Sequence, residues 1–565
     1  MRIAGAAALV LFALLAVDLH STTYYVDSRN GNDNSAGTGT GSQAWQTVTK
    51  VNSMAFGGDS LLFVCGGVWN GALNIKGTGT AAKRFVVSKY GTGAMPVING
   101  GGASAAITMA SQNYFILSNL EVTNIAPGGP STIARQGILV SGQGTDITVR
   151  DMYIHNVDGS ISGPQWYFQN SAAIRFQRSG TGWNNVLIDN NRMETIHGQG
   201  IYVVGSGGSR GNSKLVRIRN NFMKTIGGDG IDIHGCDTAI TEHNTLSGAG
   251  WQINGCCAGM WSLGYGRGCI FQFNEVYGFL DNDCDGEAWD EDNNESGQIV
   301  QYSYSHNCNG GFFLYMNTAT VPTLRYNISQ NDGASPLLSL FCLYNGDDQL
   351  KVYNNVFYNS RLGTPVQLCY NGQPNSSFFN NILVNIQTSV TGQNNCYFGA
   401  RVTGQAANGN IIADPMLVAP GTGDTGLAST GGYKLAANSP CIGKGKRIAG
   451  MGVRDFFGNT LPSTGPIDIG AHQYSNQVAA VSDLSAPGMP LPAIVERGAC
   501  GARIRLLDRA ITDARVISPS GKVVAILSAK GTTGYTVEKV TGASVVYLVD
   551  VRMGKERRTF PLVVY

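Results

Sequence analysis

A short unit recurs between residues 85 and 400 and constrains the fold more than any other sequence feature. Each unit holds a β-branched run, an Asn-rich turn and a Gly-rich turn into a second run, as in VLIDNNRMETIHGQGIYVV. The turn Asn recurs in steps of 30, 23 and 30 residues and, after a gap, in steps of 28 and 26. The marker residues are Asn191, Asn221, Asn244, Asn274, Asn327, Asn355 and Asn381.

A period of this length with two or three strands per unit is typical of a parallel β-solenoid. One coil alone leaves both strand edges unpaired, and stacking at about 4.8 Å lets the next coil pair them. Asn side chains at one corner of successive coils can pass hydrogen bonds along the stack. A β-propeller is disfavoured, because its blades run about 40–45 residues and need hairpins that are absent here. We therefore predict an all-β fold, a parallel β-helix.

Composition agrees with short strands and excludes several classes of protein. The 565-residue chain has 76 Gly and only 13% charged residues, and its 39 Lys and Arg nearly balance its 37 Asp and Glu. This balance argues against a large basic surface for nucleic acid. We expect a monomer whose partner is a polysaccharide substrate, with no nucleic-acid partner.

The N-terminus predicts export. Met1-Arg2 precedes an apolar run from Ile3 to Val17, and polar sequence begins at Asp18. The run is shorter than the roughly 20 residues that cross a bilayer, so residues 1–21 indicate a signal peptide. No later segment is apolar enough to span a membrane, and we expect a secreted or cell-surface protein. All 12 Cys follow the signal, and disulfides or buried thiols are favoured over a metal site.

Both ends of the repeat region resemble a known superfamily. The segment TYYVDSRNGNDNSAGTGTGSQAWQTVTKVNSMAFGGDSLLFVCGGVW resembles the N-terminal cap of right-handed parallel β-helix proteins of the pectin-lyase-like superfamily. The stretch SPCIGKGKRIAGMGVRDFFGNTLPSTGPIDIGAHQY resembles their closing segment, with residues 468–471 as the last strand. The resemblance covers residues 22–474 and implies a right-handed parallel β-helix domain. It implies no single activity, because this superfamily hosts lyases, hydrolases, epimerases and adhesins.

The C-terminal part has a different character. Residues 475–492 are rich in Pro, Ser and Ala and indicate a linker. Residues 493–565 alternate strands and turns and resemble the small β-sandwich of type IX secretion sorting domains. The resemblance implies sorting or surface attachment, and an accessory sandwich without a sorting role is the alternative.

Aligning strands by their entry glycines predicts where chemistry lies. The aligned strands are IYVV at 201, IDIH at 231, MWSL at 260, WDED at 289 and FFLY at 312. Alternate side chains of a strand point outward. The predicted outward column consists of Tyr202, Asp232, Trp261, Asp290 and Phe313, and the column beside it of His234, Asp292 and Tyr315.

Aromatic rings beside carboxylates favour a carbohydrate site. Rings stack on the C–H faces of sugars, so Tyr202, Trp261, Phe313 and Tyr315 are candidate substrate-binding residues, with Arg175 one coil upstream for an anionic sugar. Rings that merely cover the sheet are the alternative.

The carboxylates of the two columns supply the candidate catalytic groups. Asp232 and Asp290 would lie two coils apart, about 9.6 Å at the coil spacing. That spacing permits hydrolysis by a single displacement. Asp292 or His234 would assist.

An acidic run between residues 281 and 292 suggests calcium. Its first six residues match D-x-D-x-D-G, and position 12 is again an acid. It lacks the flanking helices and terminal Glu of an EF-hand, and a solvated acidic turn is the alternative. The candidate calcium ligands are Asp281, Asp283, Asp285, Glu287 and Asp292.

Three functions remain open from the sequence. The first is an extracellular glycoside hydrolase that cleaves a plant or algal cell-wall polysaccharide through paired carboxylates. The second is a calcium-dependent pectate or uronate lyase, for which Arg267, Arg325 and Lys351 are candidate bases. The third is a non-catalytic polysaccharide-binding protein or adhesin.

Overall fold

The computed structural model describes most of the chain. Side chains are described for residues 21–160, 169–205, 213–250, 257–280, 285–316, 318–334, 338–344, 349–361, 366–370, 377–388, 390, 392–399 and 407–474, and the backbone alone for 167–168 and for strands between 493 and 564. The predicted signal peptide, apart from Ser21, and the predicted linker lie outside the described residues. Among the described residues, no helix is long and apolar enough to cross a membrane.

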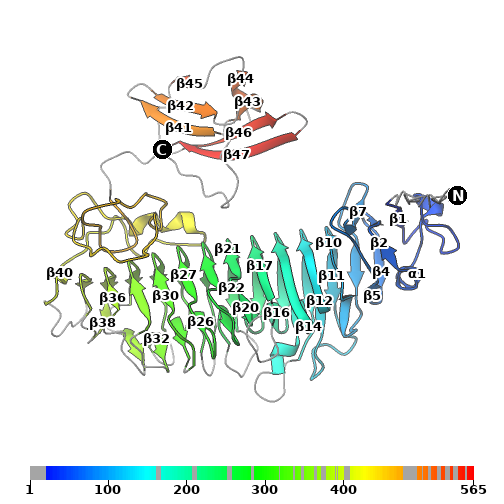
Figure 1. The fold of residues 1–565 in the computed structure, drawn as a ribbon, viewed down its shortest axis with the longest axis horizontal. Helices are drawn as coiled ribbons and strands as arrows, with labels where there is room; N and C mark the ends of the chain where they lie inside the picture. Colours follow the sequence, from blue (N-terminus) through cyan, green and yellow to red (C-terminus); the bar gives the residue numbers. More distant parts are fainter. Residues whose placement is uncertain are drawn as a thin grey trace, which may run out of the picture.

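The repeat region is a parallel β-helix with three walls (Figure 1). The first wall holds β5 (Leu73–Ile75), β9 (Ala105–Ala110), β16 (Gln199–Val204), β19 (Ile231–His234), β23 (Met260–Leu263), β26 (Glu287–Glu291), β29 (Gly311–Tyr315), β32 (Ser339–Leu343), β35 (Val366–Tyr370) and β38 (Ile386–Gln387). The second holds β1 (Thr23–Val26), β3 (Ser60–Val64), β7 (Phe85–Tyr90), β10 (Phe115–Ser118), β17 (Ser213–Arg219), β20 (Cys236–Asp237), β21 (Ile240–Glu242), β24 (Ile270–Gln272), β27 (Ile299–Gln301), β30 (Thr323–Arg325), β33 (Lys351–Tyr353) and β36 (Phe378–Phe379). Two long strands, β12 (Gln136–Arg150) and β14 (Ala172–Asp189), run through both walls and join them into one sheet.

The third wall is a separate parallel sheet. Its strands are β4 (Val68–Asn70), β8 (Val97–Asn99), β11 (Glu121–Asn124), β13 (Tyr153–Val157), β15 (Arg192–Ile196), β18 (Phe222–Ile226), β22 (Thr245–Ala249), β25 (Glu275–Tyr277), β28 (Tyr304–His306), β31 (Ile328–Gln330), β34 (Val356–Tyr358), β37 (Ile382–Val384), β39 (Cys396–Phe398) and β40 (Ile411–Ile412). At the N-terminal end, α1 (Val48–Asn52) and the pair β2 (Phe56–Gly57) and β6 (Gly77–Thr78) form the predicted cap.

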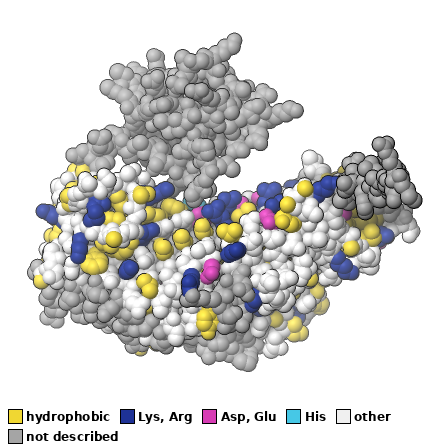
Figure 2. Space-filling view, viewed as in Figure 1, with side chains coloured by type: hydrophobic (Ala, Val, Ile, Leu, Met, Phe, Trp, Pro, Cys, Tyr) yellow, Lys and Arg dark blue, Asp and Glu magenta, His cyan; other side chains and the backbone are white. Residues whose placement is uncertain are grey.

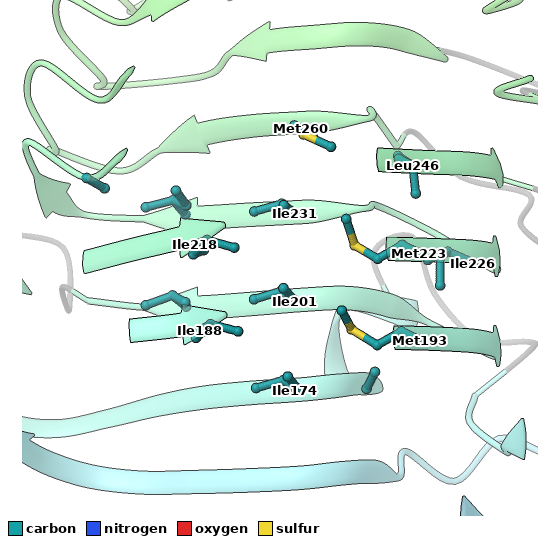
Figure 3. Close-up of a cluster of buried hydrophobic side chains, with 14 of the residues drawn as sticks. Ile174, Ile188, Met193, Ile201, Ile218, Met223, Ile226, Ile231, Leu246 and Met260 are labelled. Carbon is teal, nitrogen blue, oxygen red and sulfur yellow. The ribbon is translucent and has the colours of Figure 1, made fainter. Parts of the chain in front are cut away.

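The core is built from stacked apolar side chains, one set per coil. Ile201, Ile231 and Met260 follow one another along the first wall, while Ile188 and Ile218 enter from the second wall (Figure 3). All are fully buried. Because strand side chains alternate between faces, this inward stack forces the next residue of each first-wall strand outward.

The predicted Asn ladder is present between the second and third walls. The amide of Asn191 donates to Asn221 at 2.9 Å, Asn221 to Asn244 at 2.9 Å, and Asn244 to Asn274 at 3.1 Å. The gap in the marker series is filled by Ser303, whose hydroxyl accepts from the backbone N–H of Asn274 at 3.2 Å. The ladder resumes from Asn327 to Asn355 at 3.0 Å.

The closing segment, residues 407–474, folds back over the outside of the helix near its C-terminal end (Figure 1). It buries a second apolar cluster in which Tyr302 and Tyr326 of the coils pack with Met451 and Phe456, and hydrophobic side chains gather over this end in Figure 2. The expected last strand at residues 468–471 is wrong. Ile467 makes only an isolated antiparallel bridge to Gly445, and the Gly470 amide nitrogen donates to the carbonyl oxygen of Asn380.

The C-terminal strands pair as two antiparallel sheets. One contains β41 (Ala493–Gly498), β42 (Gly501–Leu506) and β45 (Tyr535–Glu538). The other contains β43 (Ile511–Ile517), β44 (Val523–Ser528), β46 (Val545–Met553) and β47 (Glu556–Val564). Their sorting role stays a prediction.

The cysteines with described side chains are buried, and none of Cys65, Cys236, Cys269, Cys308, Cys342, Cys369, Cys396 and Cys441 forms a disulfide. Cys342 and Cys369 lie on neighbouring strands but point to opposite faces, because Phe341, not Cys342, pairs with Cys369.

Candidate functional site

The predicted register of the first wall is correct over four strands. Tyr202 pairs with Asp232, Asp232 with Trp261, and Trp261 with Asp290. Asp232 and Asp290 therefore lie on the same wall, two coils apart, with Trp261 between them. Arg175 precedes Tyr202 in this series. We call these five residues the deep column.

The register expected for β29 is wrong by one residue. Trp289 pairs with Phe313, not with Phe312, and Glu291 pairs with Tyr315. On the earlier strands a small residue, Gly or Ala, comes directly before the first inward-facing residue of the aligned segment. Phe312 occupies that position here, and the entry glycine, Gly311, comes one residue earlier.

As a result, Phe313 and Tyr315 do not belong to the substrate surface. Both are fully buried in the core cluster, and the Tyr315 hydroxyl donates to the carbonyl oxygen of Ala319 at 3.1 Å. The outward position opposite Asp290 is Leu314. The wall instead carries exposed rings farther along, at Tyr344 and Tyr370.

A second outward column runs beside the first, and we call it the rim column. His234 pairs with Leu263, and the Asp292 amide nitrogen donates to the carbonyl oxygen of Ser262 at 3.0 Å, which places Asp292 next to Leu263. His234, Leu263 and Asp292 are all half-buried, whereas Asp232 is fully buried and Asp290 is 4% exposed. The expectation of an openly exposed acidic wall is therefore wrong: the deep column forms a floor, and the rim column is its more accessible edge.

Sequence reasoning missed two buried polar residues of this floor, Gln199 and Asp229. The Gln199 amide donates to an oxygen of Asp229 at 3.0 Å and to one of Asp232 at 3.2 Å. The other Asp229 oxygen accepts from the Ala258 amide nitrogen at 2.9 Å. The available signal was the motif GDGID, which places two acids three residues apart at the entry of β19.

Burial shifts the acid–base equilibria of the floor. Desolvation raises the pKa of Asp229 to about 7, despite its hydrogen bonds. Desolvation, and then the charge of Asp229, raises the pKa of Asp232 well above its ordinary value. Desolvation and the charges of Asp292, Asp285 and Glu287 raise the pKa of Asp290. One oxygen of Asp232 and one of Asp290 are buried without a hydrogen-bond partner in the structure.

Asp292 and His234 behave differently from the floor acids. Desolvation raises the pKa of Asp292, but the backbone amide and side chain of Asn293 donate to it and oppose that rise. Burial lowers the pKa of His234, and its Nδ1 has no partner. Asp292 thus accepts two hydrogen bonds, both from Asn293, whereas one oxygen of Asp290 has no partner in the structure.

Arg175 closes one end of the deep column. Its guanidinium lies 4.7 Å from the centre of the Tyr202 ring and donates to Gln177 at 3.0 and 2.6 Å. Tyr202 is 7% exposed. The Tyr202 ring and the Arg175 guanidinium are therefore both held in fixed positions beside Asp232.

The calcium prediction is only partly within the described structure. Asp281 and Asp283 lie outside the described residues, while Asp285, Glu287 and Asp292 are described. Within the described residues, no group of three acidic, His or Cys side chains is placed to hold a metal ion. Asp285 and Glu287 both lie close enough to raise the pKa of Asp290. Calcium binding stays a prediction.

Comparison with known proteins shows glycosidase relatives. No protein-family model matches the chain. It is 27% identical over 592 residues to a lacto-N-biosidase of Bifidobacterium longum subsp. longum, an alignment that covers 80% of this chain and 36% of that protein. The chain therefore spans about a third of the length of this relative.

A solved structure shares the fold. The crystal structure of the GH136 lacto-N-biosidase from Eubacterium ramulus matches with a TM-score of 0.50 and 21% identity over 60% of this chain and 64% of that one. Pectate lyase Pel9A matches with a TM-score of 0.43 and 14% identity over 80% of this chain and 97% of that one.

Proposed function

We propose that this chain is a glycoside hydrolase that cleaves glycosidic bonds of a glycan on the outer face of the first wall. The observation that carries the proposal is the set of carboxyl groups around Trp261, two of which have an oxygen without a hydrogen-bond partner. The sequence similarity to a lacto-N-biosidase supports the same reaction class.

Asp290 is the general acid in this proposal. A general acid must hold its proton near neutral pH, and burial together with neighbouring carboxylates is the usual way to achieve this. Asp290 has both features, because desolvation and the charge of Asp292 raise its pKa. It would donate its proton to the glycosidic oxygen as the bond to the leaving sugar breaks.

Asp292 is the ionised partner. The base or nucleophile must be a carboxylate in the empty site, and Asp292 is half-buried with two donors from Asn293. Asp290 and Asp292 are two residues apart on one face, roughly 6.6 Å along the strand. Asp232 lies farther away, is fully buried and has a raised pKa, so it suits binding a sugar hydroxyl better than accepting a proton.

The lyase alternative has less support at this site. Arg325 and the exposed Lys351 belong to the second wall, and Arg267 lies beyond the end of β23. Among the described residues, Arg175 is the cation that acts on Asp232, and it already donates to Gln177. An adhesin role remains a distinct outcome of the experiment below.

The test uses purified wild-type protein with an aryl lacto-N-bioside and with neutral and uronate-rich cell-wall polysaccharides. Reducing ends without absorbance from an unsaturated product are expected. Absorbance from an unsaturated product would overturn hydrolysis in favour of a lyase, and binding without cleavage would favour an adhesin.

Three matched variants test the roles. Asp290→Asn is expected to lower kcat/KM by about 10²- to 10⁴-fold. Asp292→Asn should lower it similarly, with azide restoring turnover. Glu291→Gln is the control, since Glu291 lies between them but faces the core opposite Ser262 and Tyr315. Full activity of Asp290→Asn would refute the assignment.

A further inference from the structure

A polar cavity of about 210 Å³ lies at the corner between the first and second walls. Its lining residues come from three successive coils and are Tyr265, Gly266, Arg267, Asn294, Glu295, Ser296, Thr318 and Thr320. We call it the corner cavity. It contains none of the residues assigned above to catalysis.

Glu295 is the buried acid of this cavity. The residue is 1% exposed, and desolvation raises the pKa of Glu295 to about 8. Hydrogen bonds from Cys269, Gly266 and Ser262 to its carboxyl group act to lower this pKa. A Cβ at position 266 would lie 2.6 Å from one of the carboxyl oxygens, so the carboxyl group can pack this closely only because residue 266 is glycine. Glu295 therefore forms the buried inner side of the cavity.

The walls of the cavity are aligned from coil to coil. Arg267 bridges to Ser296, and Ser296 to Thr320, as residues of adjacent coils. The Thr320 hydroxyl donates to Ser296 at 2.9 Å, and the Thr318 hydroxyl donates to Asn293 at 2.9 Å. Arg267 and Tyr265 stand exposed at the edge. Hydroxyls, an amide, a guanidinium and a ring line the cavity, and these groups suit a hydroxylated, uncharged ligand.

The cavity directly continues the rim column. Tyr265 follows Leu263 by two residues, and Glu295 follows Asp292 by three, which limits the backbone path to about 10 Å. We propose that the corner cavity binds a sugar residue of the glycan next to the bond that is cleaved over Asp290 and Asp292. The position of the cleaved bond rests on the proposed hydrolase function, whereas the binding of the sugar residue does not.

The experiment separates binding from cleavage. Asp290→Asn protein is titrated by calorimetry with oligosaccharides of increasing length, prepared from whichever glycan in the panel above it binds. In this background, Arg267→Ala and Thr320→Val are added. Arg267 is exposed and Thr320→Val keeps the side-chain shape, so both should fold. Lys351→Ala, an exposed cation of the second wall, is the control.

We expect the affinity for the oligosaccharides to increase at one chain length. Arg267→Ala and Thr320→Val should each reduce this increased affinity by about tenfold, whereas Lys351→Ala should leave it unchanged. Unchanged affinity at every length overturns the inference. Length-dependent loss in a protein that hydrolyses nothing overturns only the proposed function, and absence of binding to all glycans overturns both.

Discussion

Asp229 offers the sharpest test of the site's electrostatics, because its carboxyl group is fully buried yet hydrogen-bonded. The perturbation is Asp229→Asn, which keeps an oxygen for the Ala258 amide and removes the titration. Gln199 can turn its side-chain amide to accept from the new NH₂, since its own oxygen has no partner in the structure.

The direction in which pH changes the free energy of unfolding follows from proton binding. Desolvation raises the pKa of Asp229 from 3.8 to about 7 on folding, so the folded protein binds more protons than the unfolded chain between these values. The free energy of unfolding therefore falls as pH rises through this window. A shift of about 3 units corresponds to at most about 4 kcal/mol. For a β-helix of roughly 450 residues, with an unfolding entropy of about 1 kcal/mol/K, this is about 4 °C in Tm.

The assay is calorimetric Tm of wild type and Asp229→Asn from pH 4 to pH 8. The Tm of Asp229→Asn should increase relative to that of the wild type as pH rises, and the difference should reach about 4 °C near pH 8. The two Tm values should differ least near pH 4. Asp414→Asn, an exposed carboxylate of the closing segment, controls for the general change in charge. Parallel curves for wild type and Asp229→Asn would refute the claim that burial of this group sets its pKa.

Two further outcomes concern the ladder and the cation. Asn244→Ala removes a buried side-chain amide that donates to the carbonyl oxygen of Ile218 at 2.9 Å and to Asn274. It should lower the free energy of unfolding by about 2–4 kcal/mol, measured by Tm against the exposed control Asn34→Ala. An unchanged Tm would contradict the stabilising role of the Asn ladder. Calcium is expected to raise the Tm of EDTA-treated protein by binding to the acidic run that includes Asp285. Equal Tm values with and without calcium would contradict calcium binding.

The sequence alone was sufficient for the architecture. The recurring turn Asn predicted both the parallel coils and the ladder, because a solenoid repeats the same local environment once per coil and so repeats the residue that satisfies it. The same periodicity placed Asp232, Trp261 and Asp290 in one outward column, since the alternation of strand side chains follows from the inward Ile and Met residues.

The sequence could not predict features that depend on how one coil meets its neighbours. Phe312 replaces the small residue that marks strand entry, and only the pairing of Trp289 with Phe313 shows that Phe313 and Tyr315 face the core. The burial of Asp232, the shared donor Gln199 and the corner cavity likewise depend on residues from different coils. Burial, and with it each carboxyl pKa, is a property of the packed assembly of coils, whereas periodicity is already present in the chain.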